Sequence, residues 1–260
     1  IRDRDVSGLT LGNGSGGTPG LSSNYKLDGG THTFNVTKKD ITFSGSRVYD
    51  ATTTVSSSDL VTNDTTSGET LAFSGSGTVS SANVQNNQSI TLGSIAIADG
   101  SGGGLASNYN LTTGTFDISQ KWVSVSGQKI YDATTTVSSS NLNVTGEVSG
   151  ESISITGTGS ISDKNVGSGK SINTTGLSLA DNTSNASNYS LSTGTFNVNQ
   201  KAINVVGTRQ YDATTSISSG NTSFSGLIGS ETLNKSGSIS TSSSNAATYT
   251  SGSINISSLT

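Results

Sequence analysis

The sequence predicts an all-β protein, a tandem array of about 80-residue antiparallel β domains that forms an elongated rod. The string Tyr-Asp-Ala-Thr-Thr occurs three times, at spacings of 82 and 80 residues. Apolar and polar residues alternate throughout, as in Val123/Val125 and Ile203/Val205, and a period of two is typical of half-buried strands. Helical patterns of Ala, Leu, Glu and Lys are missing. An immunoglobulin-like sandwich and a β-grasp-like unit both suit a repeat of this size.

Other residues keep step with the repeated Tyr-Asp pair. A Lys precedes each Tyr by ten residues, and a Glu follows each Tyr by twenty. Fixed offsets over such a distance indicate a folded unit the size of a small domain. The repeat signature consists of Tyr49, Asp50, Tyr131, Asp132, Tyr211, Asp212, Lys39, Lys121, Lys201, Glu69, Glu151 and Glu231.

The repeats divide the chain into four segments. Residues 1–37 are interpreted as the C-terminal part of an upstream repeat, because Gly8-Leu9-Thr10-Leu11 matches Gly176-Leu177-Ser178-Leu179. Residues 38–120 and 121–200 are complete repeats, and residues 201–260 are a repeat that lacks its last strands. We align Ser253–Ile256 with the Leu177/Leu179 strand, and expect the natural protein to continue at both ends.

The junctions between repeats contain no flexible linker. Residues 116–125 and 196–205 hold neither Gly nor Pro, so the last strand of one repeat runs almost directly into the next. Since Gly/Ser linkers are flexible and a short strand-to-strand crossing is not, we expect limited bending between repeats.

The composition excludes several classes of function. The formal net charge is −4 with only 13 basic residues, which leaves no basic surface for nucleic acid. Cys is absent and there is one His, so a thiolate nucleophile, a His-based triad and a zinc site lack their residues. No apolar run approaches the roughly 18 residues of a membrane span. We expect no catalytic residue, no cofactor and no resident metal.

The Tyr-Asp pair is interpreted as structural: a packed Tyr whose hydroxyl finds a partner, followed by an Asp that accepts turn N–H groups. A recurring ion or ligand site on the Asp is the alternative. Calcium could use acidic loop positions such as Asp99 and Asp181, but no segment matches an EF-hand loop. A covalent link between the recurring Lys and an Asn, assisted by the recurring Glu, is a further alternative, and Asn24, Asn108 and Asn188 also recur.

Four strings together resemble a known group of repeats. Lys-x-Ile/Val-x-Val-x-Gly is followed by Tyr-Asp-x-Thr-Thr, then by Asp163-Lys164-Asn165-Val166-Gly167, then by Asn-Tyr-x-Leu-x-x-Gly-Thr-Phe. This pattern resembles the YDG/MBG-type repeats of large bacterial surface adhesins similar to filamentous haemagglutinin. Such repeats usually carry Gly after Tyr-Asp, whereas all three positions here are Ala. We therefore expect a turn that needs no positive φ at Ala51, Ala133 and Ala213.

The resemblance implies a secreted, cell-surface stalk that projects an adhesive tip or builds biofilm matrix, without catalysis. Its partners are then neighbouring repeats of the same chain and a host or matrix glycan or protein at a tip outside this sequence. Two alternatives stay open. Uncharged edge strands of thin sheets can pair between chains, which predicts a self-assembling extracellular filament. Loop Tyr and Asn residues in contact with sugar would instead make a glycan-binding array.

Overall fold

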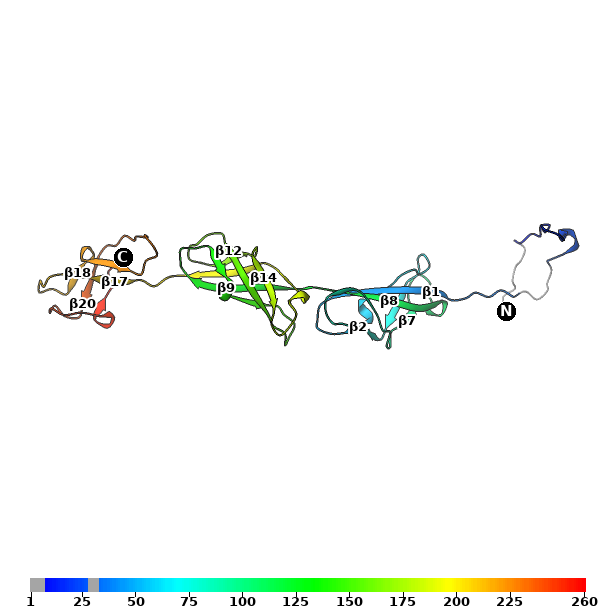
Figure 1. The fold of residues 1–260 in the computed structure, drawn as a ribbon, viewed down its shortest axis with the longest axis horizontal. Helices are drawn as coiled ribbons and strands as arrows, with labels where there is room; N and C mark the ends of the chain where they lie inside the picture. The colour runs from blue at the N-terminus through cyan, green and yellow to red at the C-terminus, as the bar shows by residue number, and fades with distance from the viewer. Residues whose placement is uncertain (1–7, 28–32) are drawn as a thin grey trace.

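The computed structural model describes residues 8–27 and 33–260, and it is mostly β with several sheets. Figure 1 draws three groups of strands one after another in chain order. Within this described part, every helix is a single 3-10 turn of three residues, and none could cross a membrane. The all-β prediction is confirmed, and the alternating apolar residues account for it.

Each of the first two groups holds eight strands. In the first group they are β1 Lys39–Val48, β2 Thr54–Ser56, β3 Leu60–Thr62, β4 Leu71–Ser74, β5 Ser76–Thr78, β6 Gln85–Ser89, β7 Ala96–Asp99 and β8 Tyr109–Ser119. In the second they are β9 Lys121–Ile130, β10 Thr136–Ser138, β11 Leu142–Thr145, β12 Ile153–Ile161, β13 Gly167–Asn173, β14 Leu177–Asp181, β15 Tyr189–Leu191 and β16 Gly194–Asn199.

The third group holds five strands. They are β17 Asn204–Gly207, β18 Ser216–Ser218, β19 Thr222–Ser225, β20 Ser238–Thr241 and β21 Ile254–Asn255. Short 3-10 turns lead into many of the strands, with Ser, Asn and Asp in their sequences. They are η1 Ser22–Asn24, η2 Ser57–Asp59, η3 Ala106–Asn108, η4 Ser139–Asn141, η5 Ala186–Asn188, η6 Ser219–Asn221 and η7 Ser251–Ser253. We refer below to residues 38–120, 121–200 and 201–260 as the first, second and third units.

The prediction of purely antiparallel domains is wrong. The first and last strands of a unit run parallel: β1 pairs with β8 from Lys39↔Tyr109 to Val48↔Ser119, and β9 pairs with β15 and β16 in the same sense. The remaining pairs are antiparallel. A parallel first and last strand brings the chain in at one end of the unit and out at the other. Only Gln120 separates β8 from β9.

The strands bury one face in two hydrophobic clusters. One cluster lies within the second unit and includes Val125, Val137, Phe196 and Val198. The other is centred on the first unit around Phe43 and Phe116 and extends across the boundary to buried residues of the second unit. These second-unit members are Val123, Ile153 and Tyr189. The first two units therefore share a core.

The turn after each Tyr-Asp does need a positive φ, which overturns the expectation drawn from its Ala. The φ angles of Ala51, Ala133 and Ala213 are +63°, +61° and +63°. The preceding Asp side chain bonds the N–H of the Thr two residues later, and this turn carries the intervening residue into the left-handed region. For an L residue with a Cβ that region costs roughly 1–2 kcal/mol.

Replacing Ala133 with Gly should therefore raise the free energy of unfolding of the second unit by about 0.5–1 kcal/mol. Gly removes the Cβ strain but loses more backbone entropy on folding, so the net gain is smaller than the strain. Chemical denaturation of the full chain measures it. Ala98→Gly, on an exposed strand position without positive φ, is the matched control and should be destabilising. Equal destabilisation by both changes would contradict the strain argument.

The alignment of the last strand of the third unit is also wrong. Thr241 pairs with Ile254, as Ile161 pairs with Ile172 in the second unit, so Ile254 stands in the place of Ile172. The bridge between Gly237 and Leu259 repeats the pair Gly157↔Leu177. The apolar alternation of Ile254 and Ile256 fits the strand that contains Ile172 as well as the strand that contains Leu177. Only the pairing with Thr241 identifies the correct counterpart.

The segment interpreted as the end of an upstream repeat lies partly outside the described residues, namely 1–7 and 28–32. Its described residues form no strand before β1, and η1 is their single helical turn. Their apolar side chains are exposed, including Leu9 at 65%, Tyr25 at 69% and Phe34 at 77%.

Candidate functional site: the junction between units

The Asp of each Tyr-Asp pair closes a turn. Its carboxylate accepts the backbone N–H of the Thr two residues later at 3.0 Å and the Thr hydroxyl at 2.9 Å, with the same distances in all three units. The pairs are Asp50 with Thr52, Asp132 with Thr134, and Asp212 with Thr214. These carboxylates thus serve as turn acceptors.

A basic residue clamps each of these turns, and we did not single it out from sequence. Lys129, which is 8% exposed, donates from Nζ to the carbonyl oxygens of Thr134 at 2.9 Å and Thr136 at 2.8 Å. The same nitrogen lies 2.9 Å from Asp132 Oδ1. Arg47 and Arg209 occupy the equivalent positions and bond the equivalent carbonyls. The missed signal is a basic residue two positions before every signature Tyr.

The clamp lowers the pKa of the Asp in the second unit. Burial acts to raise the pKa of Asp132, but hydrogen bonds from Lys129 and Thr134 outweigh it, so the pKa falls below its ordinary value. The pKa of Asp212 is also lowered, chiefly by hydrogen bonds from Thr214 and further by Arg209. The lowered pKa keeps the carboxylates of Asp132 and Asp212 ionised within their turns.

The Tyr of the first pair reaches into the next unit. Tyr49 is 4% exposed and donates its hydroxyl to Glu151 Oε1 at 2.6 Å, across the boundary between the first two units. Tyr189 donates to the other oxygen of the same carboxylate and accepts the Val148 N–H at 3.1 Å. The two rings meet edge to face, with centroids 5.5 Å apart and planes at 78°. One carboxylate thus holds a Tyr from each unit.

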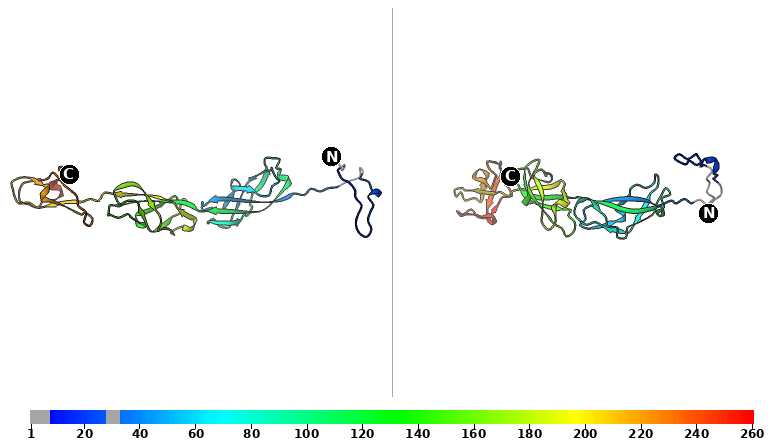
Figure 2. Two further views of the ribbon diagram at one scale, coloured as in Figure 1. Left: turned by 90° about the horizontal axis from the view of Figure 1, so that it is seen from above. Right: turned by 45° about the vertical axis from the view of Figure 1, so that its right-hand side comes forward.

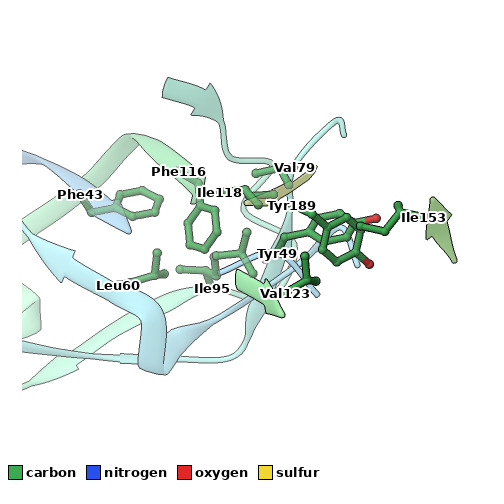
Figure 3. Close-up of a cluster of buried hydrophobic side chains, with 11 residues drawn as sticks. Phe43, Tyr49, Leu60, Val79, Ile95, Phe116, Ile118, Val123, Ile153 and Tyr189 are labelled. Carbon is green, nitrogen blue, oxygen red and sulfur yellow. The ribbon is translucent and has the colours of Figure 1, made fainter. Parts of the chain in front are cut away.

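Figure 3 shows the two tyrosine side chains at one end of the shared hydrophobic cluster. Tyr49 and Tyr189 lie beside Val123 and Ile153, whereas Phe43 lies at the opposite end, within the first unit. The tyrosine hydroxyls therefore sit at the edge of the apolar core, where the shared carboxylate satisfies them.

A buried Asn adds a second contact across the same boundary. Asn188 is 1% exposed; its Oδ1 accepts the Val84 N–H at 2.9 Å, and its Nδ2 donates to Asn83 Oδ1 at 2.9 Å. Beside it, Gln120 Nε2 donates to the Ser187 carbonyl at 3.1 Å. A buried amide with both ends bonded fixes orientation, since a misaligned neighbour would leave it unsatisfied.

The next boundary repeats part of this arrangement. Tyr131 donates to Glu231 of the third unit, and Lys164 Nζ lies 3.7 Å from the same carboxylate. Within the first unit, Tyr109 donates to Glu69 as Tyr189 does to Glu151. The three signature Glu residues therefore share one role, which is to accept a tyrosine hydroxyl. Tyr211 differs from the other signature tyrosines and is 65% exposed.

The recurring lysines do not join this cluster. Lys39 and Lys121 begin strands β1 and β9, and Lys201 is exposed. No ion pair links any of them to a signature Glu in residues 8–27 and 33–260. The same part of the chain contains no group of three His, Cys, Asp or Glu side chains that could hold a metal ion. The chemistry that the site supports is mutual attachment of units.

Alkaline pH should loosen the first junction. Burial, and then the hydrogen bond to Glu151, raise the pKa of Tyr189 from 10 to about 12, and the same two causes raise that of Tyr49. A raised folded pKa favours the protonated phenol in the fold. The stabilisation is thus complete below pH 10 and is lost as the pH rises towards 12. Denaturation measured across this window should show stability falling.

Glu151→Gln is the control for that titration. It keeps the shape of the side chain but removes the charge that opposes phenol ionisation, so the fall should become shallower. A wild-type chain whose slope equals that of Glu151→Gln would contradict the assignment.

Comparison with known proteins places two copies of one family in the chain. A family model described as YDG domain matches residues 32–116 and again residues 119–196. Neither a curated protein nor a solved structure matches.

Proposed function

This chain belongs to the YDG domain family, and from that premise we propose that it is a non-enzymatic stalk segment of a secreted bacterial surface adhesin. Its role is to hold an adhesive tip away from the cell or to build extracellular matrix. One observation carries the proposal. In each of the first two units the first and last strands run parallel, so the chain enters at one end and leaves at the other, towards the next unit.

The parallel first and last strands support an elongated rod. A strand advances about 3.3 Å per residue, so the ten residues of β1 or β9 and the eleven of β8 give each of the first two units a length of about 35 Å. Because β8 continues into β9 after one residue, these lengths add along one direction. The two views of Figure 2 agree with Figure 1 in drawing the units in line.

Stiffness would come from the junction. The shared core, the carboxylate between Tyr49 and Tyr189, and the buried Asn188 all have to break before the first two units can bend apart. A stalk gains from such coupling, because a flexible chain of domains collapses towards its anchor whereas a stiff one keeps its tip extended.

Electron paramagnetic resonance tests this stiffness by measuring the distance between two spin labels. The chain has no Cys, so labels attach only where Cys is introduced. Thr115→Cys in β8 and Ser126→Cys in β9 place exposed labels 11 residues apart on either side of Gln120. We expect one narrow distribution of distances between the two labels, centred at about 35 Å.

The control inserts Gly-Ser-Gly-Ser after Gln120, which should broaden the distribution. A native junction as broad as the insertion variant would contradict the stalk proposal. Surface location is tested separately: antibodies against the segment should label intact cells of the producing organism. Labelling only after permeabilisation would argue against secretion.

A further inference from the structure

The two longest strands of the first unit connect it to the rest of the chain. The chain enters the unit through β1 and leaves it through β8, and these strands run parallel, with residues 39–48 beside residues 109–119. Tension along the chain therefore pulls the two strands past each other in opposite directions. We propose that this strand pair is a mechanical clamp, which gives each complete unit the further function of bearing tensile load. The inference deepens the stalk proposal and rests on it for the source of that tension.

Tension loads the paired strands along their whole length. The hydrogen bonds of a parallel pair are evenly spaced and run from strand to strand, so strands that slide must break many bonds together. The register is interrupted by one bulge, between Ile41 and Phe43. The Thr112 hydroxyl reinforces this place by donating to the Ile41 carbonyl at 2.8 Å. At the other end of the pair, the Tyr49 N–H donates to the Ser119 carbonyl at 2.9 Å.

Two contacts between Phe and Gly fix the register of the clamp. Phe43 of β1 lies opposite Gly114 of β8, and a Cβ added to this glycine would overlap the Phe43 ring. Reciprocally, Phe116 of β8 lies opposite Gly45 of β1, where an added Cβ would approach the Phe116 ring to 2.8 Å. Both rings are buried in the shared cluster (Figure 3). Each strand thus packs an aromatic ring over the bare backbone of the other.

Sliding in the direction of the pull would lose both contacts. A shift of one residue would turn the buried side chains to the wrong face of the sheet. A shift of two residues would bring Phe116 opposite Arg47 and Phe43 opposite Thr112. Each ring would then meet a side chain in place of a glycine. The clamp therefore resists sliding through side-chain packing as well as through hydrogen bonds.

The second unit repeats the clamp. Its first strand, β9, pairs in parallel with β15 and then with β16. Phe196 again lies opposite a glycine of the first strand, Gly127. Val125 lies against Gly194, where an added Cβ would approach its Cγ2 to 2.6 Å. Because the weakest member of a series yields first under tension, a load-bearing array needs the clamp in every unit.

Single-molecule pulling of the full chain in two directions tests the clamp. The chain has no Cys, so handles attach only where Cys is introduced. Both variants carry Lys38→Cys, just before β1. Ser119→Cys places the second handle at the opposite end of the strand pair, whereas Ser107→Cys places it at the same end, just before Tyr109. All three substituted positions are exposed. The first arrangement makes β1 and β8 slide, and the second peels them apart.

We expect the opposite-end handles to require at least about twice the unfolding force of the same-end handles, because forced unfolding follows the barrier and not the equilibrium stability. The two variants differ only in the position of one exposed Cys, so a difference in fold does not account for such a ratio. Equal forces would overturn the clamp. The stalk proposal fails on a different result, namely a broad distribution of spin-label distances.

Two core variants with opposite-end handles test the contacts between Phe and Gly. Phe43→Ala removes one ring from the clamp and should lower the unfolding force by about half. Val55→Ala is the matched control, because Val55 is 0% exposed in the same cluster but lies on β2, which pairs with β5 rather than with β1 or β8. It should lower chemical stability and leave the force nearly unchanged. Force losses in proportion to the stability losses of both variants would overturn the role assigned to Phe43.

Discussion

Replacing Phe116 with Ala is expected to lower the free energy of unfolding of the first unit by about 3–5 kcal/mol. The Phe116 ring is 0% exposed and occupies the space beside Gly45, where an added Cβ would approach it to 2.8 Å. Arg47 stacks over the ring with its guanidinium carbon 5.3 Å from the centroid. Truncation would leave a cavity at the centre of the shared core and remove the ring against which the partly buried Arg47 guanidinium packs.

Hydrogen exchange with chemical denaturation measures the loss unit by unit. Because the cluster of Phe116 includes Val123, Ile153 and Tyr189 of the second unit, faster exchange should extend across the boundary. Phe34→Ala is the matched control, since Phe34 also follows a Thr but is 77% exposed. It should leave unfolding unchanged. Comparable losses in both variants would contradict the assignment of the core.

Replacing Glu151 with Ala is expected to cost about 2–4 kcal/mol, because two largely buried tyrosine hydroxyls lose a charged acceptor together. The loss should appear as weaker coupling between units as well as lower stability. We expect the native chain to unfold its first two units in one transition, because they share a hydrophobic cluster, and the variant to show two separate transitions.

Glu69→Ala is the matched control, because Glu69 accepts a hydrogen bond from the hydroxyl of Tyr109, which lies in the same unit. It should cost about half as much and leave the coupling intact. A double-mutant cycle of Glu151→Ala with Tyr49→Phe then isolates the bond across the boundary. Additive losses from these two changes would show that this bond contributes nothing.

The β class and the repeat were predictable because short stretches of sequence determine both. Alternation of the kind seen at Val123 and Val125 marks a half-buried strand whatever its partner, and the two matched family copies follow the repeated signature. The role of the signature Glu was not predictable. Its tyrosine partners lie 38 to 102 residues away, and nothing in the sequence spacing states that they meet.

Strand direction was missed for the same reason. The partner of β1 is β8, some 70 residues later, and alternation looks identical in parallel and antiparallel pairs. The turn at Ala51 was misjudged because Ala disfavours a positive φ, yet the Asx turn and the Arg47 clamp impose it. A basic residue two positions before Tyr was visible, but a lone charge is ordinarily solvated.

Small-angle X-ray scattering of the full chain at low concentration tests the central claim most directly, namely that the coupled units form an extended, stiff array. Three units of about 35 Å each in line predict a radius of gyration of about 30 Å and a rod-like scattering profile. A compact chain of 260 residues would give about 18 Å. A radius of gyration near about 18 Å for the native chain would contradict this claim. The claim would also fail if the native profile were that of flexibly linked domains and Glu151→Ala left the radius of gyration unchanged.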